Sequence, residues 1–213
     1  MGKNISLLGL QWGDEGKGKV VDFLAKDLNA AVRYQGGNNA GHTLIIGKKK
    51  IVFHLIPSAI CHKNVKCFLG RGVVVNLDAL FQEIDEVSMH SENIGDRLVI
   101  SSACSLIQKY HIKLERLREK SHFFTTIGTT GRGIGAAYED RVGRRSILIS
   151  DLYNPSVLET KLEEALEVYN FMFEKYFETD KEDKNQILEE NLYQAEKLKP
   201  YVGNVIQDLK ELQ

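Results

Sequence analysis

Residues 11–19 (QWGDEGKGK) restrict this chain to a small group of folds. Gly13, Gly18 and Lys19 satisfy the pattern G-x-x-x-x-G-K, which belongs between a buried strand and a helix. Glycines let backbone N–H groups converge on an anion, and the start of the following helix adds positive charge, as does the lysine side chain. The expected ligand is a triphosphate; the alternative is a glycine-rich turn that binds nothing.

One position departs from this pattern. Val20 follows Lys19, where such loops usually carry a Ser or Thr whose hydroxyl holds Mg²⁺. Because Mg²⁺ still needs oxygen ligands, Asp14 inside the loop is the candidate substitute. Asp14 and Glu15 would repel a phosphate unless one of them binds a metal or takes part in the chemistry. The alternative for Asp14 is a solvated aspartate in a turn.

Apolar runs alternate with helical patterns over residues 5–150, and several runs are apolar on both faces. This order predicts an α/β fold with a mostly parallel sheet flanked by helices. We predict strands at 5–10, 30–34, 65–69, 73–75 and 98–101, a hairpin of 43–46 with 51–55, and helices at about 20–28, 77–87 and 105–120.

Residues 151–213 carry only helical patterns, and Asn154 with Pro155 is suited to begin the first of three helices. The other two are expected at about 186–198 and from 204 onward. We therefore expect a nucleotide-binding core over 1–150 and a helical layer over 151–213.

Composition narrows the functional classes. The chain has 213 residues, with 29 acidic and 28 basic ones, so its formal net charge of −1 argues against a nucleic-acid binder driven by bulk positive charge. No apolar run is long enough to span a membrane, and the N-terminus does not resemble a signal peptide. The 3 cysteines suit a reducing compartment better than a disulfide framework, so we expect a cytoplasmic protein.

A second small-residue run, 36–42 (GGNNAGH), follows the strand predicted at 30–34. Open α/β sheets bind ligands at the carboxyl ends of their strands. His42 ends the run, where it can donate a proton or a hydrogen bond to a phosphate oxygen. The alternative for His42 is a purely structural role, which we expect for the other five histidines.

A third segment, 121–146, is rich in glycine and arginine and contains IGTTGRGIG at 127–135. We expect it to be a long loop, and long loops in compact domains are usually functional or disordered.

Together, the runs 11–19, 36–42 and 127–135 resemble adenylosuccinate synthetase, and the resemblance extends from residue 5 to about residue 151. That resemblance implies an enzyme of AMP synthesis that joins IMP and L-aspartate, using GTP and Mg²⁺, to form adenylosuccinate, GDP and phosphate. It also implies a homodimer.

The same resemblance implies residue roles. Asp14 matches the base that removes the N1 proton of IMP, His42 the group that donates to the leaving GDP, and Lys17 a residue that stabilises the transferring phosphoryl group. Asp14 and the carbonyl of Gly41 match the metal ligands, and Arg144 matches an arginine that reaches the partner's IMP site. The implied GTP contacts are Gly13, Asp14, Glu15, Gly16, Lys17, Gly18, Lys19, Gly41, His42 and Thr43. The implied IMP contacts are Asp14, Glu15, Gly16, Lys17, Asn39, Ala40, Gly41, His42, Thr130 and Arg144.

Two alternatives stand beside this interpretation. A regulatory GTPase would share the phosphate loop, but it predicts a Ser or Thr after Lys19 and an Asn-Lys-x-Asp motif, and the sequence has neither. A catalytically incomplete nucleotide-binding fragment is the second alternative. The family is about twice this length, and the segments that it uses to recognise guanine and aspartate are not found here.

Overall fold

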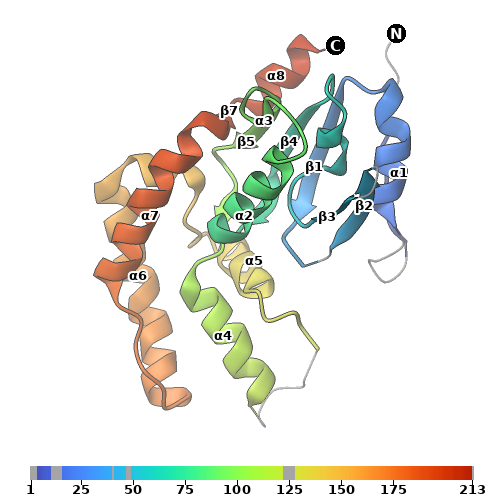
Figure 1. The fold of residues 1–213 in the computed structure, drawn as a ribbon. Coiled ribbons are helices and arrows are strands. Elements are labelled where there is room, and N and C mark those ends of the chain that lie inside the picture. Colours follow the sequence, from blue (N-terminus) through green and yellow to red (C-terminus); the bar gives the residue numbers. More distant parts are fainter. Residues whose placement is uncertain (1–3, 11–15, 40, 47–48, 122–127, 213) are drawn as a thin grey trace. The chain divides into compact units, whose positions relative to one another are not determined.

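In a computed structural model, residues 4–10, 16–39, 41–46, 49–121 and 128–212 are described (Figure 1). Their contacts group into two compact units. Unit 1 comprises Met1–Val73, Asp78–Ser102 and Pro200–Gln213, and unit 2 comprises Val74–Leu77 and Ala103–Lys199. Most of unit 2 is therefore a single insertion into unit 1, and each unit is considered by itself below.

Unit 1 is built on a parallel sheet with the strand order β1-β4-β5-β7. Its strands are β1 (Ala30–Gly36), β4 (Lys66–Val75), β5 (Leu98–Ser101) and β7 (Val202–Gly203). In β4, Cys67, Phe68 and Leu69 are fully buried on successive positions, as expected for a strand covered on both faces. The predicted α/β fold with a mostly parallel sheet is confirmed, and the two strand pieces predicted around 70 form one strand.

The pairing of β1 with β4 shifts register between Arg33 and Gln35. Gly72 lies opposite this irregularity, and a Cβ atom there would come within 2.0 Å of the Tyr34 carbonyl oxygen. Only glycine permits such a close backbone approach, so Gly72 is a requirement of this pairing.

The helices of unit 1 follow the predicted apolar faces. In α2 (Leu77–Ser88), Leu80, Ile84 and Val87 are buried, as the spacing predicts. The remaining helical elements are α1 (Lys17–Leu24), α3 (Ile94–Arg97), α8 (Val205–Glu211) and short 3₁₀ turns at Ala25–Asp27, Ser58–Cys61 and Lys199–Tyr201. The predicted hairpin is confirmed as β2 (His42–Ile46), antiparallel to β3 (Lys49–Phe53).

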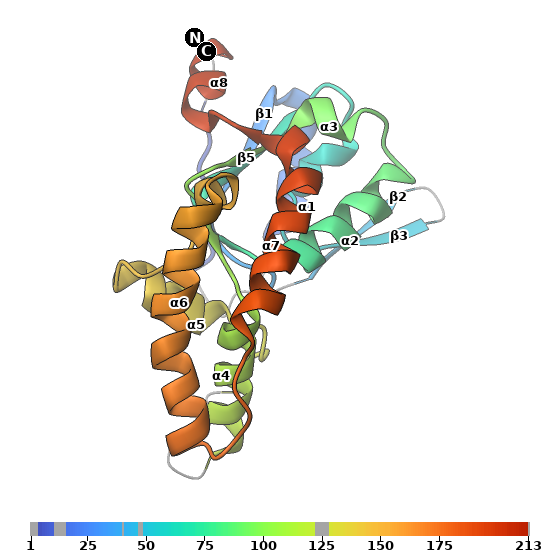
Figure 2. The ribbon, with the colours of Figure 1, turned by 90° about the vertical axis from the view of Figure 1, so that its left-hand side faces the viewer.

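Unit 2 is mostly helical. Its short strand β6 (Ser105–Leu106) pairs in parallel with Val74–Val75 at the end of β4. Figures 1 and 2 show α6 and α7 running side by side. The helices are α4 (Lys109–Lys120), α5 (Ile134–Val142), α6 (Pro155–Phe171) and α7 (Lys184–Leu198), with a 3₁₀ turn at Ile149–Tyr153 and a π-helical turn at Met172–Tyr176. As predicted, Pro155 is the first residue of α6, and the Asn154 side chain accepts a hydrogen bond from the Val157 N–H.

Three predicted elements are wrong in part. Residues 5–10 form no strand and take part in no strand pairing of the described chain, and Leu10 is 91% exposed. The helix predicted from 105 begins only at Lys109, since Ser105 and Leu106 pair with β4 instead. The predicted loop 121–146 contains α5, which the glycines around it concealed.

Among the described residues, no helix combines the length and the apolar character that crossing a membrane requires.

Candidate functional site

The described end of the phosphate loop is a glycine that starts a helix. Gly16 has a φ of 83°, and its carbonyl accepts hydrogen bonds from the N–H groups of Lys19 (3.0 Å) and Val20 (3.3 Å). The helix α1 thus begins at Lys17, earlier than predicted, and places both lysines in its first turn. No acidic residue lies in that turn, so the two lysines add their charge to the positive end of the helix dipole.

A side chain from elsewhere in unit 1 holds the same turn of α1 in place. Gly18 is buried, and the Ser58 hydroxyl donates a hydrogen bond of 2.9 Å to its carbonyl oxygen. Gly13, Asp14 and Glu15 lie outside the described residues.

The second small-residue run follows β1 and is tied down by an arginine. Gly36 ends β1 with a φ of 89°. The Arg33 guanidinium donates to the Gly37 carbonyl at 2.5 Å, and also to the carbonyls of His54 and Leu55. These bonds join the run to the segment that follows β3, so the backbone there is held from two sides.

Gly41 lies at the other end of that run. A Cβ atom at Gly41 would come within 2.9 Å of Val52 Cγ1 and 3.1 Å of His54 Cε1, so the backbone packs tightly against the hairpin. His42 begins β2 opposite Phe53, and Thr43 follows it. Asn39 is exposed, and Ala40 lies outside the described residues.

The structure brings two of the predicted segments together. Helix α1, which begins with Lys17–Lys19, lies beside β2, the strand that starts at His42, within unit 1 (Figure 1). Thr130 and Arg144 belong to unit 2.

Glu83 holds the segment that follows β3, and it was not identified from the sequence. Its carboxylate accepts hydrogen bonds from the N–H groups of His54 (3.0 Å), Leu55 (2.8 Å) and Ile56 (2.9 Å). Burial raises the pKa of Glu83 to about 7, although the three N–H groups and the charge of Arg33 oppose that shift. The sequence feature that could have identified Glu83 is an acidic residue next to Leu80 and Ile84, the apolar positions of a helix.

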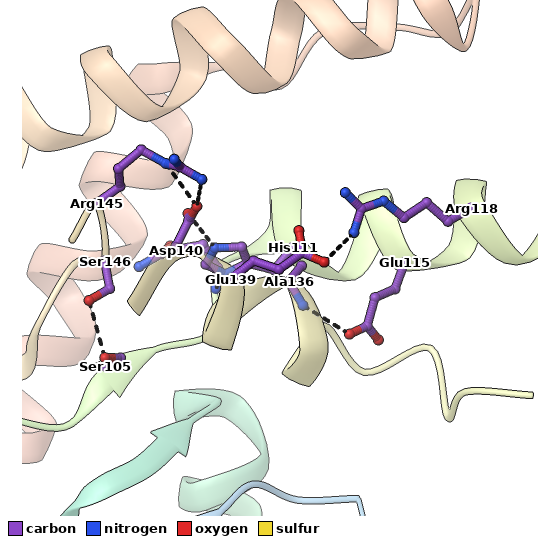
Figure 3. Close-up of polar contacts among 10 residues, drawn as sticks. Ser105, His111, Glu115, Arg118, Ala136, Glu139, Asp140, Arg145 and Ser146 are labelled. Carbon is purple, nitrogen blue, oxygen red and sulfur yellow. Dashed lines mark hydrogen bonds and ion pairs between the residues drawn. The ribbon is translucent and has the colours of Figure 1, made fainter. Parts of the chain in front are cut away.

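In unit 2, two glutamates of α4 hold the glycine-rich segment. Glu115 accepts from the N–H groups of Gly133 (2.8 Å) and Gly135 (2.6 Å) at the start of α5. It also accepts from the N–H of Ala136 at 3.3 Å (Figure 3). Glu119 accepts from the N–H groups of Gly128 (3.3 Å) and Thr129 (3.2 Å). The amides that begin α5 are therefore already occupied by a carboxylate, and exposed Thr130 lies between the two fastened stretches.

Arg144 follows α5 and is exposed, with a left-handed φ of 60°. Its neighbour Arg145 binds buried Asp140.

Several other titratable side chains of the described chain have partners within the fold or are buried. His62 Nε2 lies 2.8 Å from Asp22 Oδ1, and His111 is buried against Asp140. Burial raises the pKa of Cys61 to about 11 and that of Cys67 to about 12, so both remain thiols at neutral pH. In the described ranges, no group of His, Cys, Asp and Glu side chains has a metal-binding arrangement.

Comparison with known proteins decides the family. The sequence profile described as adenylosuccinate synthetase matches residues 6–213. The chain belongs to the adenylosuccinate synthetase family. It is 50% identical over 212 residues to the adenylosuccinate synthetase of Azotobacter vinelandii, covering 100% of this chain and 49% of that protein. It is 48% identical to the one from Acidithiobacillus ferrooxidans, covering 100% of this chain and 50% of that protein.

A solved structure of fully ligated adenylosuccinate synthetase from Plasmodium falciparum is similar with a TM-score of 0.83 and 30% identity. The similarity covers 96% of this chain and 47% of that one. The chain thus spans about half the length of the adenylosuccinate synthetases that it matches, and the resemblance inferred from its three motifs is confirmed.

Proposed function

We propose that this chain forms the part of an adenylosuccinate synthetase that binds the GTP phosphates and activates IMP. The observation that carries the proposal is the packing of α1, the helix that begins with Lys17–Lys19, against β2, the strand that begins at His42. A triphosphate held by residues 13–19 would then lie next to the segment 39–43 that is assigned to the purine nucleotide.

The chemistry follows from what this pair of segments carries. The 6-oxygen of IMP is a weak nucleophile until N1 loses its proton, and Asp14 is the carboxylate proposed to accept that proton. The oxygen then attacks the γ-phosphorus of GTP, and the bond to the β-phosphate oxygen breaks, giving 6-phosphoryl-IMP and GDP. Lys17 offsets charge on the transferring group, and His42 donates a hydrogen bond to the leaving GDP. The amine of L-aspartate then displaces the phosphate at C6.

The proposed metal ligands fit Mg²⁺ in their chemistry. Asp14 supplies a carboxylate oxygen and Gly41 a carbonyl oxygen, both hard donors. The crowding of a Cβ atom at Gly41 by Val52 and His54 means that the Gly41 backbone is tightly held. When bound, Mg²⁺ would neutralise phosphate charge.

Further contacts are proposed from the family. Asn39, Ala40 and Thr130 would contact IMP, and Arg144 would reach the IMP site of a second subunit in a cytoplasmic homodimer. Arg144 is exposed, which leaves its side chain accessible for such a contact.

Positional isotope exchange within GTP tests the role of Asp14, since this exchange reports reversible γ-phosphoryl transfer to IMP. In the protein at its natural length, Asp14→Asn should abolish exchange and retain nucleotide binding. Asp27→Asn, in the turn after α1, is the matched control and should exchange normally. Undiminished exchange in Asp14→Asn would remove Asp14 as the base.

His42→Asn should lower kcat strongly and change the affinity for IMP much less, because the proposed hydrogen bond strengthens only as GDP leaves. Normal turnover in this variant would contradict that role.

One observation favours a second candidate, a nucleotide-binding fragment without turnover: the chain spans about half of its relatives. Calorimetry of these 213 residues with IMP, GDP and Mg²⁺, beside an assay of adenylosuccinate formation, separates the two. Binding without product supports the fragment, and product supports the enzyme.

A further inference from the structure

Arg144 occupies a backbone position that normally takes glycine. Helix α5 ends at Val142, and the N–H of Arg144 bonds to the Arg141 carbonyl (3.2 Å) while the N–H of Arg145 bonds to the Asp140 carbonyl (2.8 Å). These two bonds are those of a Schellman motif, in which the residue after the helix cap is left-handed and is usually Gly or Asn. Arg144 is that residue, with a φ of 60°.

A charged side chain in this conformation is disfavoured unless its surroundings impose it. Here the same two residues that close the motif through the backbone are joined a second time through their side chains. Arg145 donates from Nε (3.2 Å) and Nη2 (2.9 Å) to Asp140 Oδ1 (Figure 3). The backbone and side-chain bonds between residues 140 and 145, which we call the clamp, therefore enclose Arg144.

The Arg145 guanidinium also folds over Gly143. A Cβ atom at Gly143 would lie 3.0 Å from Arg145 Nη1 and 3.1 Å from the Glu139 carbonyl oxygen. A larger residue at 143 would press on the guanidinium. Glycine is therefore needed here to make room for the Arg145 side chain, and not because of an unusual φ.

Asp140 is itself held from the other side by α4. His111 Nδ1 accepts a hydrogen bond from the Gln108 N–H (2.9 Å), so the ring proton lies on Nε2 and is donated to Asp140 Oδ2 (3.0 Å). Both side chains are almost fully buried, at 0% and 1% exposure. Tyr169 lies against His111 with a ring-centroid distance of 5.6 Å. Asp140 thus has one oxygen fixed by the core and the other fixed by Arg145.

We propose that Asp140 and Arg145 are positioning residues whose clamp holds Arg144 in the left-handed conformation that aims its guanidinium at the partner subunit's IMP. This inference rests on the proposed function. Arg145 would not touch the substrate. It would act by holding Arg144 in position to contact the IMP that is bound in the second subunit.

Steady-state kinetics of the protein at its natural length provide the first test. The Arg145 side chain is 57% exposed, so Arg145→Ala removes the clamp without opening the core. We expect KM for IMP to rise about tenfold while kcat and KM for GTP stay within about twofold, since only binding of one substrate is affected. Arg145→Lys should fall between, because a lysine keeps the charge but loses the paired donors.

Arg118→Ala is the matched control. Arg118 of α4 pairs with Glu139 of α5, the residue directly before Asp140, at 2.6 Å, so the control removes a different arginine that also binds a carboxylate of α5. We expect its kinetics to match those of the wild type. Unchanged KM for IMP in Arg145→Ala, or an equal effect in Arg118→Ala, would overturn the proposal.

Subunit mixing provides the second test and separates positioning from simple loss of folding. If Arg144 acts on the partner, Arg145→Ala subunits mixed with Asp14→Asn subunits form heterodimers that each contain one complete site. Random mixing in equal amounts should then recover about a quarter of the wild-type activity at low IMP. Mixing Arg145→Ala with Arg144→Leu should recover none.

The outcomes remain distinguishable from failure of the proposed function. If the wild-type protein forms no adenylosuccinate, the proposed function is wrong and the clamp's role falls with it. If the wild type is active and Asp14→Asn rescues Arg144→Leu but not Arg145→Ala, only the positioning role is wrong. Asp140→Asn, checked for folding by thermal unfolding, should behave as Arg145→Ala in the same mixtures.

Discussion

At the scale of single residues, hydrogen bonds offset the effect of burial on the pKa to different extents in His111 and Asp140. Burial lowers the pKa of His111 below its ordinary value of 6.5, and the hydrogen bond and charge of Asp140 only partly offset this. Burial also raises the pKa of Asp140, but the bonds from His111 and Arg145 outweigh it, so its pKa lies below the usual value. The pair therefore consists of a neutral imidazole and an ionised carboxylate.

This pair predicts a pH dependence of stability. Since the folded pKa of His111 is lowered, its contribution is complete above about pH 6.5 and is lost as pH falls toward the folded value. The loss has a slope of at most about 1.4 kcal/mol per pH unit. Urea unfolding between pH 7.5 and 5 should show a flatter profile in His111→Gln than in the wild type. Parallel profiles would contradict the assignment.

The stability that Glu83 contributes depends on pH in the opposite direction. Its folded pKa is raised to about 7, so the stability that it contributes is greatest below about pH 4.5 and is lost as pH rises through 7. Even so, Glu83→Gln should destabilise by about 1–3 kcal/mol, because its amide group would face one of the three N–H donors. Hydrogen exchange at the Leu55 amide should accelerate. Glu86→Gln on the same helix is the control and should leave that rate unchanged.

At the scale of elements, the pairing of β1 with β4 is the contact most sensitive to one atom. Gly72→Ala should destabilise by about 2–3 kcal/mol, because its Cβ would overlap the Tyr34 carbonyl oxygen and force the strands apart. Thermal unfolding measures the effect. Gly95→Ala in α3 is the matched control: nothing lies within 4 Å of its Cβ, so little change is expected. Equal stability of the two variants would mean that β1 and β4 can separate locally at little cost.

The element that sequence patterns missed, α5, shows why glycine counts mislead. Gly133 precedes it with a φ of 78°, and Glu115 from α4 satisfies the amides that follow. A helix of nine residues between glycine-rich stretches has little helical propensity of its own and depends on such tertiary partners. By contrast, α6 was predictable, because Asn154 and Pro155 are local start signals.

At the scale of the molecule, the chain leaves unit 1 after Ser102 and returns at Pro200 to add β7 beside β5. Removing residues 200–213 should therefore expose the edge of β5 and speed hydrogen exchange at Leu98–Ser101, with little change in α6 of unit 2. A truncation after Lys210 keeps β7 and is the control. Equal protection of β5 in both truncations would show that β7 adds nothing to unit 1.

The sequence by itself determined the α/β class, the hairpin, the strand at 98–101 and the family, because periodicity and the motifs at 11–19, 36–42 and 127–135 are encoded by neighbours along the chain. Only the tertiary structure decided that Glu83 fastens the segment after β3, that α5 exists, and that Asp140 and Arg145 clamp Arg144. Each of these depends on partners that lie well apart in sequence or on a backbone conformation opposed by local preference. Such contacts form only when burial brings distant segments together and makes an unsatisfied polar group costly.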